Sequence, residues 1–256
     1  MPRESEDTVP GMVDATPPPD SFRLPMSEGR EAWWFLASGP TDPASNMAMD
    51  EALLEASRRL GRPVLRVYSW TRPAATFGYF QHHAEIAGWT SLRPLLRRPT
   101  GGGLVPHDAD WTYSLAVPPG HAWHGLPAVE SYQRVHQWLQ AAFARHGVPT
   151  ALAPCCDPRG PGQCFVGAER FDLLWTGRKI AGAAQRRNRN GLLIQGSIQA
   201  PPSGLRRSDW ESAMLEVAGA SSGVTWDALI PDPSLVARCE ELVATKYSRA
   251  EYHEKR

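Results

Sequence analysis

Apolar and polar positions along the chain follow two different periods, which predict strands in some segments and helices in others. Strands are expected where β-branched and aromatic residues alternate with polar ones or run together between turn residues. The segments with this pattern are 64–70, 75–80, 95–98, 111–117 and 192–198. A hairpin is expected over 171–182, with its turn at Thr176-Gly177-Arg178.

Helices are expected where helix formers dominate or apolar residues recur three or four apart. These segments are 46–60, 129–146, 208–217 and a last helix from 232 onward. Ser45 or Asn46 is the expected cap of the first helix, Ser208 that of the third, and Gly61 ends the first. Asp232-Pro233 opens the last helix, because proline suits the first helical position.

The order of these elements is helix, several strands, helix, hairpin, strand and two helices, without strict alternation. That order predicts an α+β fold with a central, mostly antiparallel or mixed sheet flanked by helices. Residues 1–28 are rich in acids and prolines, and we expect them to form a disordered tail. Residues 29–256 are then a single domain.

Composition narrows the function classes. The 256 residues carry 27 basic and 27 acidic side chains, so the net charge gives no basic excess for nucleic acid. Apolar residues make up 42% and charged residues 21%, as in a globular protein. The sequence has neither an apolar run long enough to span a membrane nor a signal-peptide core, and its four cysteines suggest reduced thiols. We therefore expect a cytoplasmic protein that binds neither nucleic acid nor membranes.

A glycine-rich segment follows the short strand 95–98, with the sequence Arg97-Arg-Pro-Thr-Gly-Gly-Gly-Leu-Val-Pro-His107. Adjacent glycines allow positive φ and close backbone approach, and their amides can face a carboxylate, a phosphate or an acyl carbonyl. The neighbouring arginines add charge-assisted donors. A plain glycine-rich turn is the alternative, and no nucleotide-binding glycine pattern is present.

Two further side chains have chemistry of their own. Lys179 begins a strand with small residues, where an ammonium can neutralise a carboxylate, a phosphate or an oxyanion; a solvated hairpin lysine is the alternative. Cys164 is a possible nucleophile if nearby cations lower its thiol pKa, and a small buried residue is the alternative. Cys155, Cys156, Cys164 and His146 lack the C-x-x-C spacing of zinc sites, so no metal site is predicted.

These segments, in this order, resemble the lipoate–protein ligase A and octanoyltransferase family, which is related to biotin protein ligases. The segments that carry the resemblance are 46–53, 65–70, 77–81, 97–107, 177–187 and 191–198. The resemblance covers about residues 31–200 and implies one catalytic domain of the biotin/lipoate protein ligase type, which is similar to class II synthetases. The family transfers a lipoyl or octanoyl group to one lysine of a lipoyl domain, in 2-oxoacid dehydrogenases or the glycine cleavage H protein.

The resemblance also implies roles for particular residues. Lys179 touches the acyl carbonyl or the activated carboxylate, and Cys164 is similar in position to the nucleophilic cysteine of the octanoyltransferases. The residues implied for substrate binding are Arg98, Thr100, Gly101, Gly102, Gly103, His107, Gly182 and Gln185. Arg186, Arg187 and Arg189 are implied as a basic face for an acidic lipoyl domain, with a solvated hairpin as the alternative.

Three functions follow. The first is transfer of an octanoyl or lipoyl group through an acyl-Cys164 thioester, with an octanoyl carrier protein or an acylated H protein as donor and no cofactor. The second is a ligase that uses free lipoate, ATP and Mg²⁺ through lipoyl-AMP. The third is a non-catalytic acyl-binding module, suggested by one departure from the family pattern. Ile194-Gln195-Gly-Ser stands where the family usually has Gln-His-Gly-Ser, so a histidine is absent.

Overall fold

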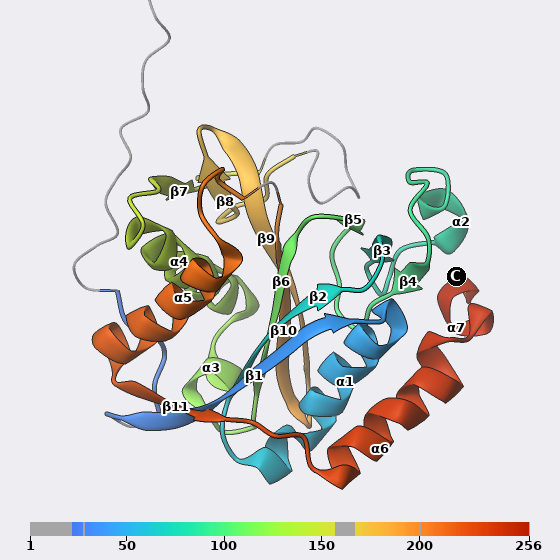
Figure 1. Ribbon diagram of the computed structural model, residues 1–256, viewed down its shortest axis with the longest axis horizontal. Helices are drawn as coiled ribbons and strands as arrows, with labels where there is room; N and C mark the ends of the chain where they lie inside the picture. The colour runs from blue at the N-terminus through green and yellow to red at the C-terminus, as the bar shows by residue number, and fades with distance from the viewer. Residues whose placement is uncertain (1–21, 28, 157–166, 200, 256) are drawn as a thin grey trace, which may run out of the picture.

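The computed structural model describes residues 22–27, 29–156, 167–199 and 201–255, and it is built around an eight-stranded sheet (Figure 1). The strand order of this sheet is β11-β1-β2-β6-β10-β9-β8-β7, and a separate three-stranded sheet has the order β4-β3-β5. The strands are β1 (Glu31–Thr41), β2 (Val64–Trp70), β3 (Ala74–Phe77), β4 (Leu95–Arg97), β5 (Val105–His107), β6 (Trp111–Val117), β7 (Thr150–Leu152), β8 (Leu173–Trp175), β9 (Arg178–Asn188), β10 (Gly191–Ile198) and β11 (Val224–Ala228).

Helices cover the large sheet on both sides, so the protein has three layers (Figure 1). The helices are α1 (Pro43–Leu60), α2 (His83–Ile86), α3 (Ala122–Gly125), α4 (Ala128–Ala144), α5 (Arg207–Ser222), α6 (Pro233–Leu242), a π-helical turn η1 (Val243–Tyr247) and α7 (Ala250–Glu254). One apolar core lies between the sheet and the α4–α5 layer, and a second lies between the sheet and the α1–α6 layer. A small third core supports the three-stranded sheet.

The strand pairing confirms the α+β prediction with a mixed sheet. β1 pairs in parallel with both β11 and β2, whereas the pairs from β2 through β6, β10, β9 and β8 to β7 are antiparallel. In the small sheet, β3 is parallel to β4 and antiparallel to β5. The antiparallel centre matters for function, because it places β9 and β10 beside each other in a fixed register.

Two predicted helix caps are wrong. Helix α1 begins at Pro43, and Asp42 caps it by accepting a hydrogen bond from the Ala44 amide at 3.0 Å. An Asp-Pro pair combines a favoured cap with a favoured first residue, so it outcompetes Ser45 and Asn46. Helix α5 likewise starts at Arg207, without a side-chain cap from Ser208, and continues to Ser222 instead of ending near 217. The predicted opening of the last helix at Asp232-Pro233 is confirmed.

The folded part of the chain begins earlier than predicted. Phe22 and Leu24 are buried in the core against the α4–α5 layer, and the Leu24 amide donates to Ser222 Oγ at 2.7 Å. Residues 22–27, assigned to the tail by composition, therefore join the domain, whereas residues 1–21 lie outside the described part. Within the described segments, no helix has both the length and the apolar character that crossing a membrane requires.

Candidate functional site

The glycine-rich loop joins β4 to β5 and lies against the end of β3. The Tyr79 amide donates to the Thr100 carbonyl at 2.8 Å, and Gly102 has a positive φ of 80°. A Cβ at Gly78 would lie 1.9 Å from the Gly102 carbonyl oxygen. The two backbone segments therefore approach so closely that position 78 must be glycine, and the loop has a fixed shape.

Arg98 and His107, both predicted to line the pocket, support the loop from within the protein. Arg98 is buried and donates to the Gly101 carbonyl at 2.5 Å. His107 is buried with Nε2 2.9 Å from Thr76 Oγ1 and Nδ1 2.8 Å from Asp110 Oδ2. Its ring stacks on Trp70 at 4.0 Å between centroids. Both ring nitrogens of His107 therefore have partners within the protein, which fix the orientation of the ring.

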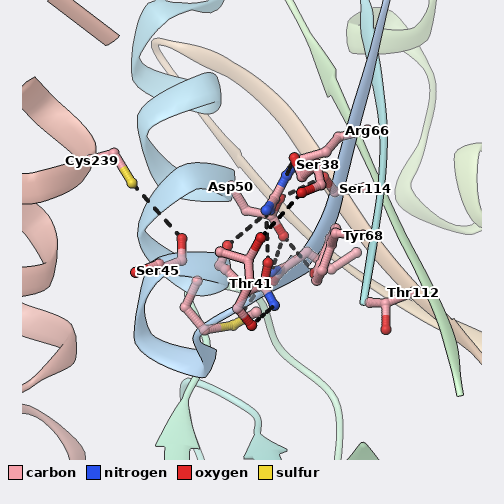
Figure 2. A network of polar contacts seen from close by, with 12 residues as sticks. Ser38, Thr41, Ser45, Asp50, Arg66, Tyr68, Thr112, Ser114 and Cys239 are labelled. Carbon is pink, nitrogen blue, oxygen red and sulfur yellow. Dashed lines mark hydrogen bonds and ion pairs between the residues drawn. The ribbon is translucent and has the colours of Figure 1, made fainter. Parts of the chain in front are cut away.

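Thr100 connects the loop to the buried centre of the protein. Its hydroxyl donates to Gln195 Oε1 at 2.7 Å, and Gln195 Nε2 donates to Asp50 Oδ2 at 2.7 Å. Asp50 also accepts hydrogen bonds from Arg66 at 2.7 Å and from Ser114 at 2.6 Å, as Figure 2 shows. Gln195, which stands where the family usually has histidine, thus bridges the loop and the core.

Lys179 lies in a different cluster, in which it forms a buried ion pair. Its Nζ is 2.7 Å from Asp172 Oδ2, with 7% of the lysine side chain and none of the aspartate side chain exposed. Tyr132, on α4, donates a hydrogen bond to the other carboxylate oxygen of Asp172. A Cβ at Gly182 would lie 2.9 Å from Lys179 Cε and 3.1 Å from Nζ. The lysine end therefore occupies the space that Gly182 leaves open, at a position that the family resemblance implies for substrate binding.

The alternation of side chains along β9 relates the two clusters. Arg186 donates to the Pro99 carbonyl at 3.4 Å, so the face of β9 that carries Arg186 is directed toward the glycine-rich loop. Gln185 donates to the Ala128 carbonyl at 2.7 Å and therefore lies on the opposite face, toward α4. Gly182 has the parity of Arg186. The ammonium of Lys179 packs against Gly182, and its partner Asp172 bonds to Tyr132 of α4, so the ion pair lies beside β9 between Gly182 and α4.

The predicted basic face is only partly present as a surface. Arg186 is directed to the loop, as described above, and lies over the ring of Tyr79. Arg187 points the other way and donates to the His124 carbonyl, and partial burial lowers its pKa. The carbonyl of Arg189 accepts from Arg58 at 3.5 Å. These contacts favour a structural role for Arg187 over docking.

Burial shapes the titration of the groups around Asp172. It lowers the pKa of His136 from 6.5 to about 4, while the nearby Asp172 carboxylate opposes the shift. His136 Nδ1 is 2.9 Å from the Tyr132 carbonyl, and Nε2 has no partner among the described residues. Burial also raises the pKa of Tyr132 well above 10, and the Asp172 charge adds to this effect. His136 is thus a neutral neighbour of the ion pair.

The remaining predicted residues have different outcomes. Cys164 lies outside the described residues, so its role stays a prediction. Gly103 is buried in the loop. Cys155 and Cys156 are exposed, and within the described ranges no three His, Cys, Asp or Glu side chains group as metal ligands do.

Asp172 and Tyr132 were not predicted from the sequence, because nothing in their local sequence indicates that they meet Lys179.

The bridge through Gln195 predicts a stability effect. Gln195→Leu removes the acceptor of Thr100 and one donor to Asp50, which costs about 1–3 kcal/mol for each group left without a partner. Gln195→His should cost less, since a neutral imidazole offers one donor and one acceptor. Urea unfolding measures both. Equal stability of the Leu variant and the parent chain would show that the bridge contributes nothing.

The buried His136 predicts a dependence of stability on pH. Its pKa is lower in the folded state than in the unfolded chain, so between pH 6.5 and about 4 the unfolded state binds more protons. The free energy of unfolding should therefore fall as the pH drops through this window, by up to about 1.4 kcal/mol per pH unit. His136→Phe should flatten this slope in pH-dependent urea unfolding, whereas exposed His82→Phe should not. A slope unchanged by His136→Phe contradicts the assignment.

Comparisons with known proteins identify the family. The model of the lipoyl protein ligase A/B catalytic domain matches residues 42–207. Octanoyltransferase LipM of Staphylococcus aureus is 36% identical over 184 residues, and the match covers 66% of each chain, just under two thirds of the relative.

Solved structures share the fold at low sequence identity. A T. acidophilum protein described as a candidate lipoate protein ligase has a TM-score of 0.71 and 18% identity, and the match covers 88% of this chain and 100% of that one. A lipoate-protein ligase A bound with ATP has a TM-score of 0.68 and 17% identity, covering 88% and 98%. Because the family model covers more than half of its residues, the chain belongs to the lipoyl protein ligase A/B catalytic domain family.

Proposed function

We propose that this protein is an acyltransferase that moves an octanoyl group from a thioester donor to a specific lysine of a lipoyl domain. The observation that carries the proposal is the 36% identity to octanoyltransferase LipM over 184 residues. The family model spans residues 42–207, which include the glycine-rich loop and Lys179. The proposed donor is an octanoylated carrier protein or an acylated H protein. The proposed acceptor is the lipoyl domain of a 2-oxoacid dehydrogenase or the H protein.

The proposed chemistry has two balanced steps. The Cys164 thiolate attacks the thioester carbonyl, a new carbon–sulfur bond forms, and the donor thiolate leaves and takes up a proton. The acceptor amine then attacks the acyl-Cys164 carbonyl, an amide forms, the Cys164 thiolate leaves, and the amine loses a proton. Lys179, with glycine-rich loop amides, stabilises the oxyanion in each step. No cofactor takes part.

The charge balance at Lys179 suits a neutral thioester. Its ammonium is paired with the Asp172 carboxylate. An ammonium whose charge is balanced in this way can still donate a hydrogen bond to a carbonyl oxygen. It offers less to a polyanionic triphosphate, for which unbalanced positive charge is the main attraction.

An ATP-dependent lipoate ligase is the second candidate, and the fold shared with a lipoate-protein ligase A bound with ATP favours it. That reaction would need ATP and Mg²⁺, and the same Lys179 would face the activated carboxylate. A non-catalytic acyl-binding module was suggested by the missing histidine. The bridge formed by Gln195 gives this departure a structural explanation and weakens that reading.

Cys164 provides the test. Incubation with octanoylated carrier protein should add the mass of one octanoyl group to the protein, and Cys164→Ala should abolish both this adduct and transfer to a lipoyl domain. Exposed Cys156→Ala is the matched control and should keep both. Intact-mass spectrometry measures the adduct, and full transfer by Cys164→Ala would refute the mechanism.

A further inference from the structure

Asp172 is bound more tightly than a surface carboxylate in an ion pair would be. Its side chain is fully buried and accepts hydrogen bonds from the Lys179 ammonium at 2.7 Å, the Glu169 amide at 2.6 Å and the Tyr132 hydroxyl. Buried ion pairs persist only when further hydrogen bonds satisfy the remaining lone pairs. Tyr132 and the Glu169 amide supply those bonds, so the carboxylate cannot turn away from Lys179 without losing them.

The backbone before Asp172 also fixes its direction. Phe171 has φ of 71°, a left-handed conformation that is uncommon for a bulky side chain. The Phe171 amide donates to the Ala153 carbonyl and the Asp172 amide to the Glu169 carbonyl, at 2.8 and 3.0 Å. Such strain persists only where surrounding contacts determine it, and here it aims Asp172 inward toward Lys179.

Lys179 is confined from the other side by Gly182. A methyl group there would overlap the end of the lysine side chain, with Asp172 Oδ1 also only 3.2 Å away. Gly182 has an ordinary φ, so alanine introduces no backbone strain at this position. The flexible lysine end would move instead of the strand. Gly182 therefore works as a spacer that lets the ammonium lie between β9 and Asp172.

The titratable groups around the pair come from three elements. Tyr132 and His136 belong to α4, and Tyr113 of β6 contributes a buried hydroxyl without a hydrogen-bond partner in the described part of the chain. Burial raises the pKa of Tyr113 and Tyr132, with the Asp172 charge adding to both effects, and burial lowers that of His136. These three neighbours are neutral at physiological pH, so the charge of the cluster resides in Lys179 and Asp172.

From this geometry we infer that Asp172, locked by Tyr132, is a positioning residue that holds the Lys179 ammonium over Gly182 for oxyanion stabilisation. Asp172 and Tyr132 act through Lys179 and do not touch the acyl group. The role of Lys179 in this inference rests on the proposed acyl transfer, whereas the immobilisation of its ammonium does not.

The immobilisation can be observed directly, because the chain contains only three lysines: Lys179, Lys246 and Lys255. Lysine-selective ¹⁵N labelling gives one ammonium signal for each, and the exchange of its hydrogens with water reports hydrogen bonding. Asp172→Asn should accelerate exchange at Lys179 at least about tenfold, as expected for the loss of a charge-assisted hydrogen bond. Lys246, which is paired with Glu51, is an internal control and should be unaffected.

Activity provides the second readout. Asp172→Asn and Gly182→Ala should each lower kcat for octanoyl transfer about tenfold or more while the KM for the carrier changes little, because the affected contact is made in the transition state. Tyr132→Phe should lower kcat less than Asp172→Asn does. In the Asp172→Asn background it should have no further effect on kcat, because Tyr132 acts only through Asp172. Glu55→Gln, an acid-to-amide change in the surface pair with Arg238, should leave kcat unchanged.

The outcomes separate this inference from the proposed function. An unchanged Lys179 signal and kcat in Asp172→Asn, or additive losses with Tyr132→Phe, overturn the positioning role. If the parent protein transfers no octanoyl group, the proposed function fails. Hydrogen exchange at the Lys179 ammonium then still tests whether Asp172 holds it in place. If Asp172→Asn does not fold, Tyr132→Phe and Gly182→Ala decide by the same two readouts.

Discussion

The rest of the structure depends on the hydrogen bonds that the buried Asp50 carboxylate accepts. The carboxylate is fully buried on α1 and accepts hydrogen bonds from Arg66 and Tyr68 on β2 and from Ser114 on β6 (Figure 2). It also accepts a hydrogen bond from Gln195 on β10. A buried charge is tolerated only when its partners are all in place, and removal of one partner of such a pair typically costs about 3–5 kcal/mol. The network therefore fixes α1 against three strands at once.

The candidate site inherits its shape from this network. The Gln195 side chain hydrogen-bonds to both Asp50 and Thr100, and so links the buried network to the glycine-rich loop. The loop also packs against Gly78 at the end of β3. A second buried carboxylate, Asp110, holds His107 and also accepts from Ser197 at 2.6 Å. Ser197 lies opposite Gly182 in the β9–β10 register. Buried hydrogen bonds thus hold the loop region against β10, which pairs with β9, and the oxyanion stabilisation that we propose requires preorganisation of this kind.

Much of the fold could be predicted from sequence, but the site only in part. Strands β2 and β6 are found residue for residue as predicted, because their apolar runs are bounded by clear turn residues. Strand β1 was missed, since Glu31–Thr41 lacks a regular alternation and is stabilised by parallel pairing with distant β11 and β2. Long-range pairing of this kind leaves little local signal.

The same limit applies to the functional side chains. The glycine-rich loop and Lys179 were recognised from local motifs, and both are part of the described site. A motif gives the identity of Arg98 and His107 but not the direction of their side chains or their hydrogen-bond partners, and their part in substrate binding stays a prediction. Asp172 becomes visible as the partner of Lys179 only when α4, β9 and the turn before β8 come together.

The most direct test of the account is whether acyl transfer requires ATP. Purified protein, octanoylated carrier protein and a lipoyl domain are incubated without ATP or Mg²⁺, and octanoylation of the acceptor lysine is followed by mass spectrometry. Complete transfer is expected under these conditions, with no stimulation when ATP is added. Modification of the lipoyl domain only when free lipoate or octanoate is supplied together with ATP and Mg²⁺ would contradict it.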